Sequence, residues 1–238
     1  MSVVIKSAAT IMLARDTSEG IEVLLLKRNK ALKFAAGLWV FPGGKIEADE
    51  VEASEDILGA AKLAAVRETK EEANVTINKD SLLFFSHWTT PVVEPRRYAT
   101  WFFFADVSGQ DLTVQVDDSE IKKHLWVNPQ IALDKVQAGQ LAMMPPTYIS
   151  LQRIRKCQTV AEATQLLSEI EPIYILPVLQ LKDGKMVCMY EGDAGFKTGN
   201  ADAVGARHRL IANVRNGDFR FEYCDCEEVV PVNANMHL

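Results

Sequence analysis

The fold of this chain is decided by residues 65–75, AVRETKEEANV. They end a longer stretch, residues 56–74, that is rich in Ala, Leu, Lys and Glu and follows Ser54, a residue type suited to capping a helix N-terminus. The composition therefore predicts one helix over residues 56–74, with Ser54 as its N-cap.

Three glutamates, Glu68, Glu71 and Glu72, share one face of this helix because they are three and four residues apart. Carboxylates this close repel one another unless a cation neutralises them, and Mg²⁺ takes oxygen ligands of this kind. The alternative is a solvated surface on which Arg67 pairs with Glu71, a contact worth about 0.3–0.5 kcal/mol. A Pro-Gly-Gly-Lys turn at residues 42–45 favours the metal site, since its glycines offer flexible backbone N–H groups.

The opposite side of the helix is expected to pack on a sheet through Leu63, Val66 and Ala73. Small residues, which would leave room for a ligand, fall on the glutamate side: Ala61, Ala64 and Ala65.

Taken together, Gly44, Glu50 and residues 67–75 resemble the Nudix box, G-x5-E-x7-R-E-U-x-E-E-x-G-U. The spacer of residues 51–66 is longer than the usual seven residues, and Asn74 stands where the box has glycine. Asn tolerates the left-handed backbone conformation better than most residues, so Asn74 can still end the helix.

The longer spacer leaves three candidates for the first glutamate of the box: Glu47, Asp49 and Glu50. A similar insertion is typical of the Nudix branch that resembles the peroxisomal coenzyme A diphosphatases. Later segments also resemble that branch, namely residues 88–91, 95–103, 118–121 and 145–147. Trp101 departs from it, because the branch often has a basic residue before the paired phenylalanines.

The resemblance implies the Nudix α/β/α sandwich with a mixed sheet for residues 1–155. Residues 156–238 are expected to form a helical and β-rich C-terminal extension packed on the core. Apolar and β-branched runs predict strands at residues 8–13, 22–26, 38–41, 82–85, 98–107, 173–181, 186–190, 207–214 and 219–223. The run at 98–107 is apolar enough to be buried on both faces. Further helices are predicted at residues 129–138, 146–156 and 160–169.

The implied reaction is hydrolysis of a diphosphate linkage by a metal-activated water, with Mg²⁺ or Mn²⁺ as cofactor. Glu68, Glu71 and Glu72 would hold the metal, and Glu68 would share it or take the proton of the water. Arg67 would orient the carboxylates, and Glu120 is a second candidate for the general base.

Substrate phosphates are expected to contact Gly43, Gly44, Arg28, Arg96 and Arg97, with Lys27 as an alternative to Arg28. The arginines have the alternative of being solvated strand ends. The leading substrate is coenzyme A or acyl-CoA, followed by ADP-ribose or a dinucleotide. A Nudix-fold nucleotide sensor without turnover is a rival from another class, and cleavage of RNA ends ranks last.

Charge and composition limit the partners. A net charge of −6 gives no basic field for nucleic acid, and no apolar run approaches the ~20 residues that span a bilayer. Without a signal-peptide pattern the chain is expected to be cytoplasmic, with a small-molecule substrate, neither nucleic acid nor membrane as partner, and homodimerisation left open.

We assign no catalytic role to the cysteines, His87 or His208. The four cysteines lack paired zinc-site spacing and are read as reduced thiols, although Cys224 and Cys226 would share one strand face. His87 is expected to be a structural histidine. His208, between Arg207 and Arg209, is expected at a surface or interface.

Overall fold

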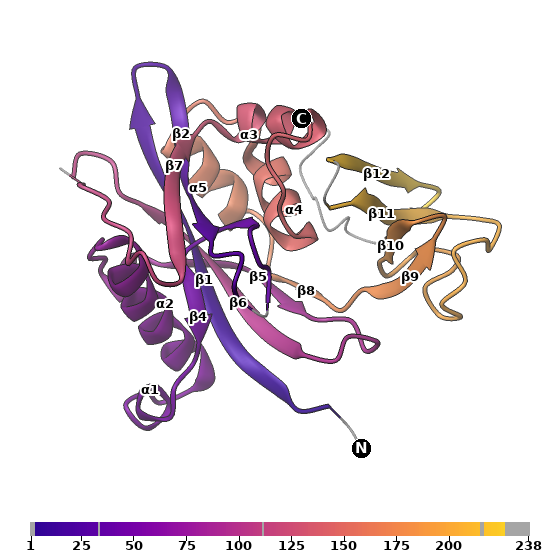
Figure 1. Cartoon of the computed structure of the whole chain (residues 1–238), viewed down its shortest axis with the longest axis horizontal. Helices are drawn as coiled ribbons and strands as arrows, with labels where there is room; N and C mark the ends of the chain where they lie inside the picture. Colours follow the sequence, from indigo (N-terminus) through magenta and orange to yellow (C-terminus); the bar gives the residue numbers. More distant parts are fainter. Residues whose placement is uncertain (1–2, 33, 111, 215–216, 227–238) are drawn as a thin grey trace.

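A mixed sheet forms the body of the protein (Figure 1). The computed structural model describes residues 3–32, 34–110, 112–214 and 217–226, and within them this sheet has eight strands. The order is β3-β2-β1-β6-β5-β8, with β4 paired to β1 and β7 paired to β2. The strands are β1 Ile5–Thr17, β2 Gly20–Arg28, β3 Trp39–Val40, β4 Gly43–Lys45, β5 Leu83–Thr89, β6 Arg97–Asp106, β7 Ile121–Val127 and β8 Ile173–Ile175. Because β1 runs parallel to β6 and antiparallel to β2, the predicted mixed sheet is confirmed.

Helices cover the two faces of this sheet (Figure 1). One face carries α1 Ala48–Glu52 and α2 Ile57–Ala73, followed by a short 3-10 turn, Lys79–Ser81. The other face carries α3 Pro129–Gln137, α4 Pro145–Ile154 and α5 Val160–Ser168. The predicted α/β/α sandwich is therefore confirmed. Within the described residues, the helices are all too short or too polar to cross a bilayer.

The central strands β1 and β6 are buried on both faces. In β1, Ile11 and Leu13 join the core under α2, while Met12 joins the core under α3 to α5. In β6, Phe103 packs on the α2 side and Phe102 on the opposite side. This double burial explains why both segments read as continuous apolar runs.

The C-terminal residues form a second sheet. Its strands are β9 Val178–Lys182, β10 Lys185–Met189, β11 Arg207–Asn213 and β12 Asp218–Cys224, in the order β12-β11-β10-β9. The single strand predicted over residues 173–181 is wrong, because β8 pairs with β5 of the first sheet and β9 pairs with β10. Pro177 lies between them, and proline has no N–H to continue a ladder. The proposed boundary at residue 155 falls between α4 and α5, which contact each other.

Helix α2 begins and ends at capped residues. Asp56, rather than the predicted Ser54, is the N-cap, since its side chain accepts a hydrogen bond of 2.7 Å from the Gly59 N–H. At the other end Asn74 has φ 57°, so the predicted left-handed C-cap is confirmed.

The side of α2 that packs on the sheet is the alanine side. Ala61, Ala64 and Ala65 are fully buried, whereas Leu63 and Val66 are only half-buried. The expectation that the alanines leave room for a ligand is therefore wrong. Small side chains instead allow the helix to approach the strands closely, which brings its glutamates down to the sheet.

The left-handed C-cap predicts a matched pair of stability changes. Asn74→Ala should lower the free energy of unfolding by about 1–2 kcal/mol, because a Cβ-bearing residue without a local polar group is strained at positive φ. Asn74→Gly should cost less than about 0.5 kcal/mol, since glycine adopts this conformation freely. Urea unfolding followed by circular dichroism measures both, and equal losses for the two variants would contradict the capping role.

Candidate active site

Two glycines of β4 make close contacts, Gly43 with β1 and Gly44 with α2. A Cβ on Gly43 would come within 2.3 Å of the Ala9 carbonyl oxygen, and a Cβ on Gly44 within 2.0 Å of Glu68 Oε1. Gly43 and Gly44 pair with Thr10 and Ala9 of the buried strand β1. The glycine turn therefore places its backbone directly against a helix carboxylate.

Glu72 is the most deeply placed of the three helix glutamates. Its Oε2 accepts a hydrogen bond of 2.9 Å from the Gly43 N–H, and its Oε1 lies 3.6 Å from Arg28 Nη1. Burial raises the pKa of Glu72 to about 8; Gly43 and Arg28 oppose this shift, and the charges of Glu68 and Glu120 add to it. Burial therefore disfavours the charged form of Glu72, and the Gly43 N–H and Arg28 compensate only part of that cost.

The pKa of the Glu68 carboxyl is raised as well. Burial raises its pKa, the hydrogen bond from Arg67 opposes the increase, and the charges of Glu71 and Glu120 add to it. The Glu71 side chain is 58% exposed, against 16% for Glu68, so it lies at the rim of the cluster.

Arg67 joins the carboxylates of the cluster to one another. Its Nε donates to Glu50 Oε1 at 2.8 Å, and its Nη1 donates to Glu68 Oε1 at 2.9 Å and to Glu71 Oε2 at 3.1 Å. Its Nη2 donates to the Lys45 carbonyl at 3.0 Å. Although burial opposes the charged form, the hydrogen bonds to Glu50 and Glu68 raise the pKa of Arg67 above its usual value.

Among the three acidic candidates before the spacer, Glu50 is the one that contacts Arg67. It is buried, and its Oε2 also accepts from the Glu47 N–H at 2.8 Å, which caps α1. The Asp49 side chain accepts from the Glu50 N–H at 3.0 Å. These contacts favour Glu50 as the first glutamate of the box.

Glu120 approaches the cluster from a different part of the chain. Its Oε2 lies 3.3 Å from Arg28 Nη2, so Arg28 stands between Glu120 and Glu72. Asp117 was not among the predicted site residues. Its side chain fixes the segment that leads into β7, because it accepts hydrogen bonds from the Glu120 N–H and the Ile121 N–H, each at 2.8 Å. An aspartate that precedes a polar turn is a known local signal for such backbone capping.

Arg96 and Arg97 lie apart from the glutamates. Arg97 Nε donates to the Thr90 carbonyl at 3.0 Å, and Arg97 stands five residues before Phe102, the partner of Thr10. At about 3.3 Å per residue this is roughly 17 Å along the sheet. No interaction in the described residues connects either arginine to the cluster, and their contact with substrate stays a prediction.

The donor chemistry of the cluster fits a hard divalent cation. In the described residues no three carboxylate, imidazole or thiol groups are arranged to enclose an ion, since Arg67 holds Glu68 and Glu71 and the Gly43 N–H holds Glu72. The fit rests instead on the oxygen-only donor set and on the buried Glu72 carboxylate, whose charge is only partly compensated.

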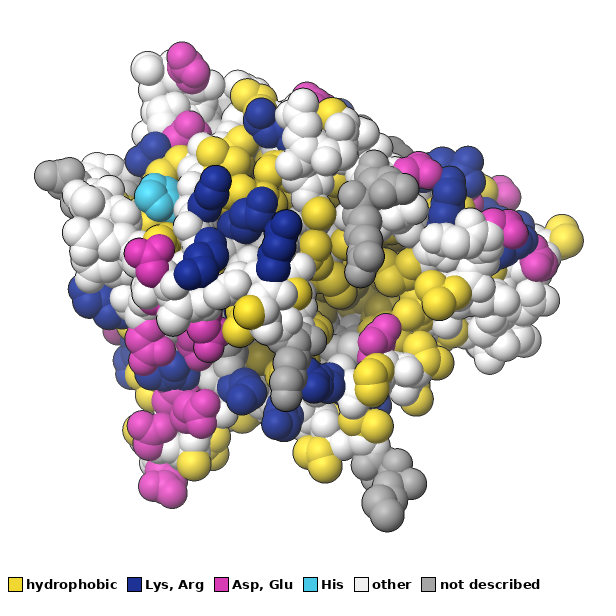
Figure 2. Space-filling view, in the orientation of Figure 1, with side chains coloured by type: hydrophobic (Ala, Val, Ile, Leu, Met, Phe, Trp, Pro, Cys, Tyr) yellow, Lys and Arg dark blue, Asp and Glu magenta, His cyan; other side chains and the backbone are white. Residues whose placement is uncertain are grey.

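The surface around the cluster is divided by charge. Figure 2 shows acidic side chains gathered over the region of α1 and α2, with several lysine and arginine side chains above them. Beside the basic side chains the surface is hollowed between the body and the C-terminal sheet, and the hollow has an apolar lining.

His87, His208 and the cysteines lie outside this cluster. The ring of His87 packs at 4.4 Å from that of Trp101. His208 was expected at a surface or interface; it is not at the surface, because it is 1% exposed and its Nδ1 lies 2.5 Å from the Glu191 carbonyl oxygen, and the interface stays a prediction. All four cysteines are free of disulfides; Cys224 is exposed and Cys226 is buried.

Comparison with known proteins gives a consistent family assignment. Residues 5–145 match the family described as NUDIX domain. A Caenorhabditis elegans relative that carries the name nudix hydrolase 7 is 25% identical over 223 residues, which cover 79% of this chain and 73% of the relative. A second relative from that organism, named nudix hydrolase 1, is 28% identical over 130 residues, which cover 55% of this chain and 31% of the relative.

A solved structure supports the fold. The crystal structure of a NUDIX hydrolase from Alicyclobacillus acidocaldarius superposes with a TM-score of 0.60 at 23% identity. The match covers 69% of this chain and 97% of that chain. At this identity the likeness establishes the architecture of the body.

Substitution by alanine is expected to lower the stability of the protein by different amounts at Gly43 and at Gly44. Gly43→Ala drives a Cβ into backbone atoms of Ala9 and Thr10, which cannot rotate away, and should cost about 2–3 kcal/mol of stability. Gly44→Ala meets only the flexible end of Glu68, so it should cost about 1 kcal/mol or less while it displaces that carboxylate. Urea unfolding gives the two stabilities, and a larger loss for Gly44→Ala would contradict this reading of the turn.

Proposed function

The chain belongs to the Nudix family, whose members hydrolyse diphosphate linkages of nucleoside diphosphate derivatives with a divalent metal, and we propose that Glu68, Glu71 and Glu72 carry this reaction here. The protein is thus a Nudix pyrophosphohydrolase. The observation that supports the site assignment is geometric: Glu68 and Glu72 lie against the glycine turn, and Arg28 joins Glu72 to Glu120.

Glu68, Glu71 and Glu72 are the proposed ligands of Mg²⁺ or Mn²⁺. When bound, such an ion stabilises negative charge on phosphoryl oxygens and lowers the pKa of a bound water. Glu72 is already fixed by the Gly43 N–H, and Glu71 at the exposed rim is free to turn from Arg67 toward an ion. Arg67 orients the set through its hydrogen bonds to Glu50 and Glu68.

Arg28 and Glu120 are proposed to act on the substrate itself. Arg28 presents two nitrogens between Glu72 and Glu120, and its buried Nε has no hydrogen-bond partner in the described residues. A guanidinium so placed suits a phosphate oxygen. Glu120 is 56% exposed and stands beside Arg28, where it would accept the proton of an attacking water; Glu68 is the alternative base.

The proposed substrate is coenzyme A or acyl-CoA. The support comes from the insertion between Glu50 and Arg67 and from the later segments that resemble the coenzyme A diphosphatases. The apolar hollow beside the basic side chains in Figure 2 suits a long, weakly polar substrate arm. ADP-ribose and dinucleotides are the alternatives within the same reaction class.

A sensor without turnover is the rival function. The complete set of Arg67, Glu68, Glu71 and Glu72 argues against it, because a binding module has no need of three carboxylates that destabilise one another.

Removal of one ligand charge tests the assignment of the site. Glu72→Gln should lower kcat at least ~100-fold, because metal binding and water activation supply several kcal/mol of the rate. Glutamine keeps the acceptor for the Gly43 N–H, so circular dichroism and the unfolding midpoint should show an intact fold. Glu71→Gln should behave similarly.

The matched control is Glu55→Gln, which removes a charge from an exposed position before α2. It should retain full kcat. If Glu72→Gln and Glu55→Gln have the same activity, the glutamate cluster is not the catalytic centre.

Product analysis tests the substrate. Incubation with coenzyme A and Mn²⁺, followed by chromatography, should yield an adenosine bisphosphate and phosphopantetheine. ADP-ribose and a dinucleoside polyphosphate serve as parallel substrates. Cleavage of either without release of phosphopantetheine would reject coenzyme A and keep the reaction class, whereas a wild-type protein that is inert toward all three would favour the sensor.

A further inference from the structure

One end of the first sheet collects exposed apolar side chains. Val3, Val4 and Ile5 lie at the N-terminal end of β1, and Val92 and Val93 lie in the hairpin between β5 and β6. Between 42% and 77% of each side chain is exposed. They are five of the thirteen large apolar residues that are exposed in the described part of the chain, so this exposure is concentrated here and not scattered over the surface.

The strand register brings these two segments together. Ile5 pairs with Arg97 at the start of the parallel β1–β6 ladder. Because the two strands are parallel, the residues that precede each of them leave the sheet at the same end. The hairpin closes at this level, since the Thr90 N–H donates to the Tyr98 carbonyl at 2.9 Å. Residues 91–96 therefore extend beside the N-terminal end of β1, which projects from the lower edge of the sheet in Figure 1.

An aromatic pair extends this apolar surface. Phe34, in the loop after β2, is 40% exposed, and its ring centroid lies 5.1 Å from that of Tyr98. Tyr98 is the cross-strand partner of Lys6. Phenylalanine and tyrosine are suited to the boundary between water and hydrocarbon, because each presents a large apolar ring and tyrosine adds a polar tip.

The basic side chains at this end have no partner carboxylate. Lys6, Arg96 and Arg97 form no ion pair within the described residues, and Arg97 uses only Nε, in its hydrogen bond to the Thr90 carbonyl. Two carboxylates lie nearby. The Glu47 side chain is turned toward the backbone of α1 in a capping box, which leaves Glu94 of the hairpin against three cations.

The net charge of −6 does not describe this surface. Charges in water act over a Debye length of about 8 Å at physiological ionic strength, so the local excess of cations determines what approaches. Figure 2 shows Lys and Arg side chains beside hydrophobic ones along the lower edge of the molecule, near the N-terminal end of β1. Apolar side chains flanked by unpaired cations are typical of surfaces that bind anionic lipid headgroups.

The shape of this end favours a lipid surface over a protein partner. A strand end and a hairpin tip are two narrow projections, whereas a stable protein interface needs roughly 800 Å² on each partner. A bilayer accepts such projections individually, because its headgroup layer adapts to each side chain that enters.

We propose that this end of the sheet binds the surface of an anionic lipid bilayer, with Val4, Val92 and Val93 entering the headgroup layer and Lys6 and Arg96 contacting lipid phosphates. The sequence led us to expect no membrane partner, because the net charge is negative and no apolar run is long enough to span a bilayer. Peripheral binding requires neither feature. The proposal is independent of the proposed reaction.

Sedimentation with phosphatidylcholine vesicles that contain or lack phosphatidylserine tests the proposal. The wild-type chain should bind the anionic vesicles more tightly, and high salt should weaken this binding. Val92→Ser/Val93→Ser should lower the partition coefficient at least ~5-fold, because two apolar side chains then stay in water. The matched control is Ile131→Ser/Val204→Ser, at exposed positions elsewhere. A wild-type chain that stays in the supernatant, or equal losses in both variants, would overturn the proposal.

The charged part of the surface has its own variant. Lys6→Gln/Arg96→Gln should weaken binding to the anionic vesicles at least ~10-fold and change binding to neutral vesicles little. Lys79→Gln/Lys197→Gln removes the same charge from exposed positions elsewhere and should bind like the wild type. Equal weakening by the two double variants would show a general charge effect and reject the surface. Circular dichroism checks that each variant is folded.

Two further measurements separate insertion from other contacts. Brominated lipids should quench Val93→Trp more strongly than they quench the four native tryptophans of the wild type, and equal quenching would reject insertion of the hairpin. Analytical ultracentrifugation without lipid tests a second copy of the chain as the partner. If the wild type is a dimer and Val92→Ser/Val93→Ser is a monomer, this surface joins two copies and the lipid proposal is wrong.

Discussion

The close approach of α2 to the strand pair β1 and β4 is the constraint on which the rest of the site depends. Small alanine side chains on the helix permit it. On β4, Gly43 allows close pairing with β1, whose backbone a Cβ would meet, and Gly44 leaves space for the Glu68 carboxylate. The approach buries Glu68 and Glu72 beside the sheet, where desolvation raises the pKa of both. Packing of apolar and small residues thus creates the electrostatic problem that a cation would relieve.

Arg67 neutralises the buried glutamates only in part. It serves Glu50, Glu68 and Glu71 at once, and Arg28 lies between Glu72 and Glu120. Two arginines therefore face five carboxylates, and the charge that remains is concentrated at the edge of β2 and β4. This incomplete neutralisation agrees with a family that works with divalent metals, whereas a structural network would be expected to balance its charges.

Much of the body could be predicted from sequence because its elements are long and strongly patterned. Helix α2 and strand β6 were recognised from composition and apolar runs, and Asn74 from its tolerance of positive φ. Two of the missed elements are short and have weak propensity. Strand β4 is Gly-Gly-Lys, and α1 is a five-residue helix capped by Glu47 and Glu50. Such segments take their conformation from tertiary contacts, which local sequence does not report.

The errors in the predicted site have a related origin. The alanine side of α2 was read as open space because small residues leave volume free, but a helix can use the same volume to approach a sheet. Strand β7, which begins just after Glu120, was missed because exposed lysines interrupt its apolar positions. His208 was placed at the surface because charged neighbours suggest exposure, yet Arg209 beside it is itself buried against Asp193.

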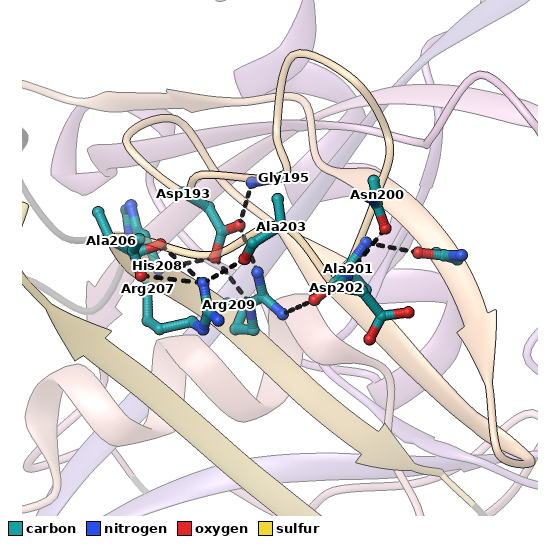
Figure 3. A network of polar contacts seen from close by, with 12 residues as sticks. Asp193, Gly195, Asn200, Ala201, Asp202, Ala203, Ala206, Arg207, His208 and Arg209 are labelled. Atoms are coloured by element: carbon teal, nitrogen blue, oxygen red, sulfur yellow. Dashed lines mark hydrogen bonds and ion pairs between the residues drawn. The ribbon is translucent and has the colours of Figure 1, made fainter.

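The networks around Arg67 and Arg209 differ in how far their charges are balanced, which is why we propose only the first for catalysis. Arg209 meets a single carboxylate, and Asp193 receives hydrogen bonds from Arg209, Gly195 and His208 (Figure 3), so that pair is neutral and saturated. A network of this kind fixes a loop and changes little when a ligand arrives. Arg67 instead shares its donors among several carboxylates that continue to repel one another. An added cation would lower the energy of the arrangement around Arg67 and would find no role beside Arg209, which is why we propose the chemistry at α2.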